Sequence, residues 1–354
     1  MNRPSRAGLL SLLLCLASCA PAVTVTPPVE PTAPARFDLS EPKYAALFGE
    51  LQAAHRFTAQ ELTQLFGQAK FLPEVPQRFA KPAELLPYNQ YRTIFITPET
   101  IANGKNYMAR NQALLQSVEQ RYGVDAAVIT AILGVETKFG KRTDGGYLVF
   151  DALNTAFTAV PQREAFARKE LIEFLVLCRE ERFDPLAVKG SYAGAMGTPQ
   201  FIASSYRAFA VDDDGDGQRN LWQSEPDILA SVANYLARHG WQKGAPIRLP
   251  VSADGQQPTV RTLLEQGLQG KTTVEKLLGS GVAWAGEPTA VDGKQEVSLL
   301  AYPSDDGEKT VALFPNFRTI LTYNRAVNYA LVVADLAEQL TAPAAATTSP
   351  PQLR

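Results

Sequence analysis

Residues 126–140 read AAVITAILGVETKFG, an apolar run with one glutamate near its end. Ile129, Ile132, Leu133 and Glu136 follow the spacing i, i+3, i+4 and i+7, which places them on one face of a helix. Glu136 therefore shares the face that should pack against the core. Because burial disfavours the ionised form of a carboxylic acid, the pKa of Glu136 should be raised. A glutamate of that kind can act as a general acid near neutral pH.

A structural role for Glu136 is the alternative. The carboxylate could pair with Lys138, Lys141 or Arg142, or it could emerge where the helix ends. The helix alone favours this interpretation, because most glutamates in periodic helical patterns are structural. The choice depends on the rest of the chain.

The composition indicates a globular, mainly α-helical protein. The 354 residues are 45% hydrophobic and 20% charged, with a net charge of −2, so no nucleic acid is expected as a partner. Helical spacing dominates residues 37–240 and returns in residues 318–340. Residues 241–317 differ, since VSLLAYP and KTVALF flank the loop SDDGE and predict a hairpin. The predicted fold is mainly α (α+β), with a small β-rich insertion.

Histidine and cysteine usage excludes several kinds of site. The only two histidines, His55 and His239, are far apart in the sequence, which excludes a multi-histidine zinc site and disfavours a histidine-based triad. Cys178 lies in the helical run FLVLC and is expected to be a small core residue.

The first 19 residues, MNRPSRAGLLSLLLCLASC, have the layout of a secretory signal. The end of this stretch resembles a bacterial lipoprotein cleavage box, which implies a signal peptide over residues 1–18 and lipidation of Cys19. No aspartate follows Cys19, so we expect a lipid anchor on the periplasmic face of the outer membrane. A plain signal peptide with chance cysteines is the alternative. Residues 19–36 predict a Pro/Ala/Thr-rich tether, and residues 341–354 a disordered tail.

A second stretch, KGSYAGAMGTPQFIASSY at residues 189–206, combines small residues with polar Ser191 and Gln200. Small residues let a backbone and a ligand approach each other closely. A tight loop that only packs helices together would show the same composition, so this stretch alone does not decide the matter.

Five motifs occur together in one order: GVETKFG, GSYAGAMGTPQF, DDDGDGQRNLW, ASVANYLARHGW and TYNRAVNYA. In this order they resemble the membrane-bound lytic transglycosylase B family, over roughly residues 40–340. The resemblance implies a lysozyme-like core with an additional helical domain in residues 37–240. It also implies a small insertion domain in 241–317 and a C-terminal core helix in 318–340. A substrate groove would lie between these parts.

The resemblance also implies roles for particular residues. Glu136 would be the only catalytic acid and base. The groove residues that would contact the sugars are Ser191, Gln200, Tyr91, Tyr235, Tyr323, Asn324 and Tyr329. Tyrosine suits saccharides, because its ring can cover a sugar face while its hydroxyl forms a hydrogen bond. A core role for Tyr235 and a helix-capping role for Asn324 are the alternatives.

The implied reaction cleaves the bond between N-acetylmuramic acid and N-acetylglucosamine in peptidoglycan glycan strands and leaves a 1,6-anhydro end. Two other functions stay open: a muramidase that adds water, and a non-catalytic peptidoglycan-binding lipoprotein. Ordinary glycosidases use two carboxylates, and no second one is evident near the apolar face. Cell-wall synthesis proteins are possible partners.

The acidic loop DDDGDGQRNLWQ predicts a structural calcium site. Asp212, Asp214, Asp216 and Gly217 match loop positions 1, 3, 5 and 6 of a helix-loop-helix calcium site, and Gln218 would offer its backbone carbonyl. Position 12 departs from the pattern, because Gln223 replaces the usual glutamate. Asp227 could supply the last ligand if the loop, 212–227, is lengthened, as the resemblance implies. A solvated acidic turn is the alternative.

Overall fold

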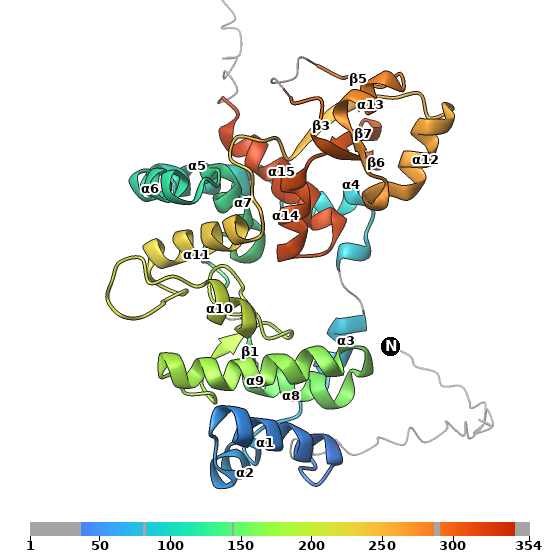
Figure 1. Ribbon diagram of the computed structural model, residues 1–354. Helices are drawn as coiled ribbons and strands as arrows, with labels where there is room; N and C mark the ends of the chain where they lie inside the picture. Colours follow the sequence, from blue (N-terminus) through green and yellow to red (C-terminus); the bar gives the residue numbers. More distant parts are fainter. Residues whose placement is uncertain (1–36, 81–82, 144, 287–290, 344–354) are drawn as a thin grey trace, which may run out of the picture. The chain divides into compact units, whose positions relative to one another are not determined.

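The computed structural model describes residues 37–80, 83–143, 145–286 and 291–343 (Figure 1). The predicted signal peptide, Cys19 and tether lie outside these residues, as does the tail from residue 344. Within the described part, no helix combines the length and the apolar character needed to cross a bilayer.

Helices make up most of the described chain. Those of the N-terminal part are α1 (Pro42–His55), α2 (Ala59–Phe66), α3 (Glu74–Ala80), α4 (Tyr88–Tyr91), α5 (Pro98–Arg110) and α6 (Gln112–Tyr122). Those of the middle are α7 (Ala126–Thr137), α8 (Val149–Ala159), α9 (Glu164–Glu181), α10 (Ala203–Phe209) and α11 (Glu225–Arg238). The last ones are α12 (Pro258–Gln266), α13 (Val274–Gly279), α14 (Pro315–Tyr323) and α15 (Val327–Thr341).

The strands form two antiparallel sheets. The small sheet pairs β1 (Tyr147–Leu148) with β2 (Lys189–Gly190). The larger sheet has the order β4-β6-β7-β3-β5. Its strands are β3 (Arg248–Ser252), β4 (Thr272–Thr273), β5 (Ala283–Trp284), β6 (Glu296–Ser304) and β7 (Gly307–Leu313).

The hairpin predicted around SDDGE is confirmed. β6 and β7 pair from Ser298↔Leu313 to Ser304↔Gly307, and a two-residue turn, Asp305-Asp306, joins them (Figure 1). The sheet packs with α12 and α13 around an apolar core of its own, which includes Val260, Leu263, Leu277, Leu299 and Phe314.

Helix α7 lies at the centre of the larger core. It packs against α5, α6, α11 and α15, and its residues from Ala127 to Val135 are buried. Spacing predicted that one face of this helix would be buried. The structure shows a wider buried surface, because side chains all round the helix contact neighbouring helices. The predicted class, mainly α with a small β-rich part, is confirmed.

The C-terminal segment 318–340 is not the single helix predicted. α14 ends at Tyr323, and Asn324 adopts an extended conformation, with φ −140° and ψ 125°. The Asn324 Oδ1 accepts a hydrogen bond from the backbone N–H of Ala326 at 3.0 Å. A short amide side chain competes in this way with the helical hydrogen bonds, and α15 begins anew at Val327.

Candidate active site

Helix α7 ends in a sharp left-handed turn directly after Glu136 and Thr137. Lys138, Phe139 and Gly140 have φ values of 51°, 60° and 82°. The N–H of Phe139 reaches back to the carbonyl of Leu133 at 3.0 Å and closes the helix. A non-glycine residue in this conformation costs about 1–2 kcal/mol, so other contacts must hold the turn.

Phe139 supplies one such contact, because its ring folds back onto the helix that it ends. A Cβ atom on Gly134 would lie 2.8 Å from Phe139 Cζ and 3.0 Å from Leu336 Cδ2, so only glycine fits there. The ring also stacks on Tyr107 of α5, with centroids 5.6 Å apart. The glycine and the phenylalanine of GVETKFG therefore form one packing unit.

Thr137 ties the same turn to the loop that contains GTPQF. Its fully buried hydroxyl donates to the Thr198 carbonyl at 2.8 Å and accepts from the N–H of Gly140 at 3.1 Å. Sequence analysis did not single out Thr137 or Phe139. Their place beside Glu136 in one motif was the available signal.

Glu136 is partly exposed at this helix end. Its Oε1 accepts a hydrogen bond from the Tyr329 hydroxyl of α15 at 2.6 Å. Tyr329 is 2% exposed, and burial, followed by the negative charge of Glu136, raises the pKa of Tyr329 well above its ordinary value. The phenol therefore keeps its proton and acts as a hydrogen-bond donor.

Tyr323 lies beside Tyr329, with ring planes 8° apart and centroids 6.3 Å apart. Burial, and then the charge of Glu136, raises the pKa of Tyr323 well above the usual range. Its hydroxyl donates to the carbonyl of Pro199 at 2.5 Å. Tyr323 thus connects the surroundings of Glu136 to the residue that precedes Gln200.

The other two predicted tyrosines border this pair. The ring of Tyr235 in α11 lies 4.9 Å from that of Tyr323, and its hydroxyl donates to the carbonyl of Thr322 at 2.6 Å. That hydroxyl stabilises the end of α14, as in the core alternative. Tyr91 is buried at the end of α4, and its electrostatic influence is the smallest of the effects that raise the pKa of Tyr329.

Ser191 and Gln200 both lie in the loop between β2 and α10. The Ser191 Oγ accepts from the backbone N–H groups of Ala193 and Ala195 at 3.3 and 3.1 Å, which shapes the loop. Gln200 has a φ of 54°, and its side-chain amide donates to the Gly197 carbonyl at 2.9 Å. Asn324 follows Tyr323 directly, at the α14–α15 turn. The structure thus gathers Glu136 and the tyrosines, with the loop of Ser191 and Gln200 joined to them through Tyr323.

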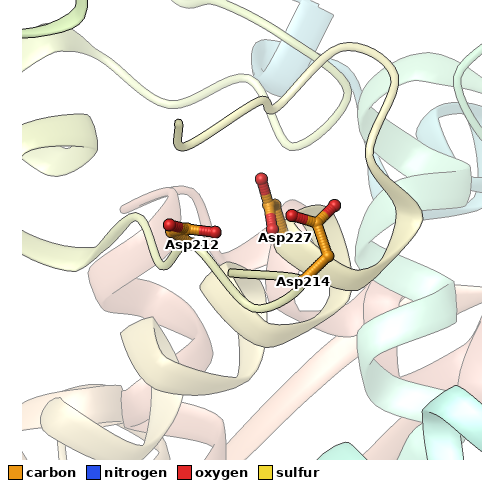
Figure 2. A group of neighbouring side chains, drawn as sticks. All are labelled: Asp212, Asp214 and Asp227. Atoms are coloured by element: carbon orange, nitrogen blue, oxygen red, sulfur yellow. The ribbon is translucent and has the colours of Figure 1, made fainter. Parts of the chain in front are cut away.

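Three carboxylates of the acidic loop and α11 converge, as Figure 2 shows. Asp212, Asp214 and Asp227 each offer an oxygen atom, and these atoms lie within 4.8 Å of one another. Asp227 is fully buried and accepts hydrogen bonds from the N–H groups of Asp213 and Asn220, both at 2.7 Å. Burial chiefly raises the pKa of Asp227, with the charge of Asp214 adding to it. Oxygen donors of this kind fit a hard cation such as Ca²⁺.

Asp216, a further predicted ligand, is not a member of this group. Its carboxylate accepts from the N–H of Gln218 at 2.8 Å. Asp212 instead accepts from Gly215 and Gly217 and so turns the loop back on itself. Asp227 joins the group because α11 begins two residues before it, at Glu225.

Residues 40–338 match the family model described as the transglycosylase SLT domain. The chain is 37% identical, over 80% of its length and 78% of the relative's, to the membrane-bound lytic murein transglycosylase B of Escherichia coli. A solved structure of the E. coli lytic transglycosylase Slt35 in complex with calcium superposes with a TM-score of 0.76, at 33% identity, over 88% of this chain and 98% of that one. SltB3 from Pseudomonas aeruginosa, solved in complex with NAG-anhNAM-pentapeptide, superposes with a TM-score of 0.73 at 31% identity, over 84% and 78% of the two chains.

The chain therefore belongs to the transglycosylase SLT domain family, whose lysozyme-like fold it shares. Within that family it groups with the membrane-bound lytic transglycosylases B, and it is a lytic transglycosylase.

Proposed function

We propose that this enzyme cleaves peptidoglycan glycan strands with Glu136 as the only acid and base, and that it leaves 1,6-anhydro-N-acetylmuramic acid ends. The observation that carries the proposal is the placement of Glu136, which is held at a helix end with one oxygen bonded to Tyr329. A carboxyl group held in this way can be presented to the bond to be cleaved.

In the first step, protonated Glu136 gives its proton to the glycosidic oxygen between the muramic acid C1 and the next sugar. The C1–O bond breaks with its electron pair on oxygen, and the 2-acetamido oxygen of the same muramic acid supports the cationic C1. Proton transfer from a positioned carboxyl group of this kind typically accelerates a reaction about 10²–10⁴-fold.

In the second step, the 6-hydroxyl of the muramic acid attacks C1, and the Glu136 carboxylate takes its proton. The glutamate is thereby returned to its protonated form, and no water is consumed. Tyr329 supports the ionised intermediate state by donating to Oε1, and its raised pKa keeps it from giving up its own proton. SltB3, a solved relative, carries an anhydro-muramyl ligand, which supports this product.

The sugars would be positioned by the groups around Glu136. We assign contacts to the saccharide and its acetamido group to Ser191, Gln200, Asn324 and the rings of Tyr91, Tyr323 and Tyr329. Tyr235 would act through Tyr323, because its own hydroxyl is bonded to Thr322.

A calcium ion, held by Asp212, Asp214 and Asp227, would be structural in this proposal. It would neutralise carboxylates that otherwise repel one another, and it would fix the loop to α11, the helix that carries Tyr235. The calcium complex of Slt35 supports this role. The Asp216 carboxylate and the Gln218 carbonyl stay predicted ligands.

We further propose that lipidation of Cys19 holds the enzyme on the periplasmic face of the outer membrane. The name of its membrane-bound relative supports the association with a membrane. Metabolic labelling with an alkynyl fatty acid should label the wild-type protein and leave the Cys19→Ala protein unlabelled, and labelling of both would contradict the assignment.

Product analysis tests the proposed reaction. Purified sacculi digested with the wild-type enzyme should release muropeptides with anhydro ends, lighter by one water than hydrolytic products, as read by mass spectrometry. Glu136→Gln should release none while keeping its circular dichroism spectrum. Reducing ends from the wild-type enzyme would establish a muramidase instead, and products from Glu136→Gln would exclude Glu136 as the acid.

A further inference from the structure

A cavity of about 550 Å³ lies where the β6–β7 hairpin meets α4 and α15. This volume falls in the range of small-molecule sites. Its floor is formed by Arg248, whose side chain is 7% exposed, together with Tyr302 and Asp335. Arg248 donates to the Tyr302 hydroxyl at 3.0 Å and to the Asp335 carboxylate. The floor is therefore rigid, with its polar groups already paired.

The lining of this cavity, floor and rim together, carries an excess of negative charge. Five carboxylates line it, from Asp305, Asp306, Glu308, Asp335 and Glu338. The cationic side chains that line it, among the described residues, are Arg92, Arg248 and Lys309, so the negative charges exceed the positive ones by two. The Asp306 side chain is 88% exposed, and Glu308 is exposed on the same hairpin, so both can meet a ligand without breaking the floor. Glu338, in contrast, already accepts a hydrogen bond from Arg248 of the floor at 3.2 Å. A ligand with an ammonium group fits this charge balance.

The cavity adjoins the surroundings of Glu136 through two helices. In α4, Tyr88 donates its hydroxyl to Asp335 on the cavity floor, and the buried Tyr91 follows three residues later. In α15, Tyr329 and Asp335 are six residues apart, or about 9 Å along the helix. A pentapeptide, such as the one in the SltB3 ligand, spans at most about 17 Å when extended. A peptide branch on a sugar beside Glu136 could therefore reach the cavity.

We propose that this cavity binds the amine-bearing peptide branch of the muramic acid unit, an inference that rests on the proposed placement of that sugar beside Glu136. The rim carboxylates receive the ammonium group, and the sheet wall covers the peptide backbone. The enzyme then favours glycan strands that carry peptides with a free amine over strands without peptides.

Steady-state cleavage of peptide-bearing strands, and of the same strands stripped of peptide by an amidase, tests this site. Asp306→Asn combined with Glu308→Gln should raise KM for the peptide-bearing strands about three- to tenfold, because the lost rim charges face solvent. Cleavage of the stripped strands should not change. The matched control is Glu265→Gln with Glu275→Gln, which removes two exposed carboxylates from the same part of the chain outside the cavity.

A second arm changes the substrate. Acetylation of the peptide amine should raise KM of the wild-type enzyme by a similar factor and should leave KM of the rim variant unchanged. The inference is wrong if KM of the rim variant rises equally for both substrates. It is also wrong if neither the substitutions nor the acetylation change KM for the peptide-bearing strands. Failure of the proposed function would show separately, as missing anhydro ends from the stripped strands.

Discussion

Tyr329 donates a hydrogen bond from its hydroxyl to Oε1 of Glu136 at 2.6 Å, across 193 residues of sequence. The bond joins α15 to the end of α7, two helices that pack against each other in the core. Tyr323, at the end of α14, adds a parallel ring and reaches the loop that contains Gln200. The motifs GVETKFG and TYNRAVNYA therefore meet at the carboxylate of Glu136, and truncation of the C-terminal helix would remove a contact to that carboxylate.

Removal of the Tyr329 hydroxyl tests what this bond contributes. Tyr329→Phe keeps the ring but leaves Oε1 of Glu136 without its donor. A hydrogen bond to a charged group is worth about 1.5–3 kcal/mol, so we expect kcat on purified strands to fall roughly 10- to 100-fold with a small change in KM.

Tyr323→Phe is the matched control for that variant. Its hydroxyl bonds the Pro199 carbonyl rather than Glu136, so kcat should fall less than in Tyr329→Phe. Equal losses of kcat in the two variants would mean that the hydrogen bond to Glu136 makes no contribution of its own.

Replacement of glycine by alanine should have opposite effects on stability in α7, where Phe139 folds back onto the helix, and in α1. Gly134→Ala would place a Cβ 2.8 Å from the ring of Phe139, and overpacking of this kind typically costs about 1–3 kcal/mol. Gly49→Ala in α1 meets open space, and replacement of a helical glycine by alanine gains up to about 1 kcal/mol. Urea unfolding should therefore show a lower midpoint for Gly134→Ala and a higher one for Gly49→Ala. A stabilised Gly134→Ala protein would contradict the packing of Phe139.

Most of the residues that the structure brings together around Glu136 stand in the quoted motifs, because each of these motifs is a short contiguous pattern. Helical spacing located Glu136 near the end of a buried helix, and the order of five motifs indicated the family. Spacing alone suggested one apolar face, whereas α7 is enclosed on nearly all sides. A pattern with so few polar residues cannot show how many neighbouring helices will surround it.

The contacts between motifs that are far apart in the sequence could not be predicted from the pattern within each motif. Nothing in TYNRAVNYA shows that Tyr329 bonds Glu136 while the hydroxyl of Tyr323 turns to Pro199. The break at Asn324 was predicted only as the helix-capping alternative for that residue, since one side-chain hydrogen bond to Ala326 decides it. Asp227 was foreseen as a possible ligand, because the spacing of the acidic loop left its last position open.

Calcium should stabilise the protein through the group Asp212, Asp214 and Asp227. An ion present at about 100 times its Kd adds about 2.7 kcal/mol, which raises Tm of a chain of this size by a few degrees. Asp214→Asn should abolish this rise in calorimetry after chelation and calcium addition, because an amide is a weaker ligand for a hard cation.

The exposed turn residue Asp254 provides the control for the calcium experiment, because Asp254→Asn removes one carboxylate far along the chain from the loop. That variant should keep the full rise in Tm. A calcium-independent Tm in the wild-type protein would favour the solvated acidic turn.

Buried Glu170 predicts a pH dependence of stability. It is 1% exposed in α9, and its carboxylate accepts from the N–H and the hydroxyl of Ser204 at the start of α10. Burial raises the pKa of Glu170 above its ordinary value near 4.5, although the two bonds from Ser204 oppose this. In the pH range between the unfolded and folded pKa values, the folded protein binds more protons than the unfolded chain. Stability from this group is therefore greatest below about pH 4.5 and falls as pH rises through the folded pKa.

Glu170→Gln should remove this contribution of Glu170 to the pH dependence of stability. The free energy of unfolding of the wild-type protein, relative to that of the variant, should decrease from about pH 4 to about pH 7, as measured by urea titrations at each pH. Glu164→Gln, at the exposed start of the same helix, should follow the wild-type curve. A wild-type protein that gains stability relative to Glu170→Gln as pH rises would show that the bonds from Ser204 outweigh burial.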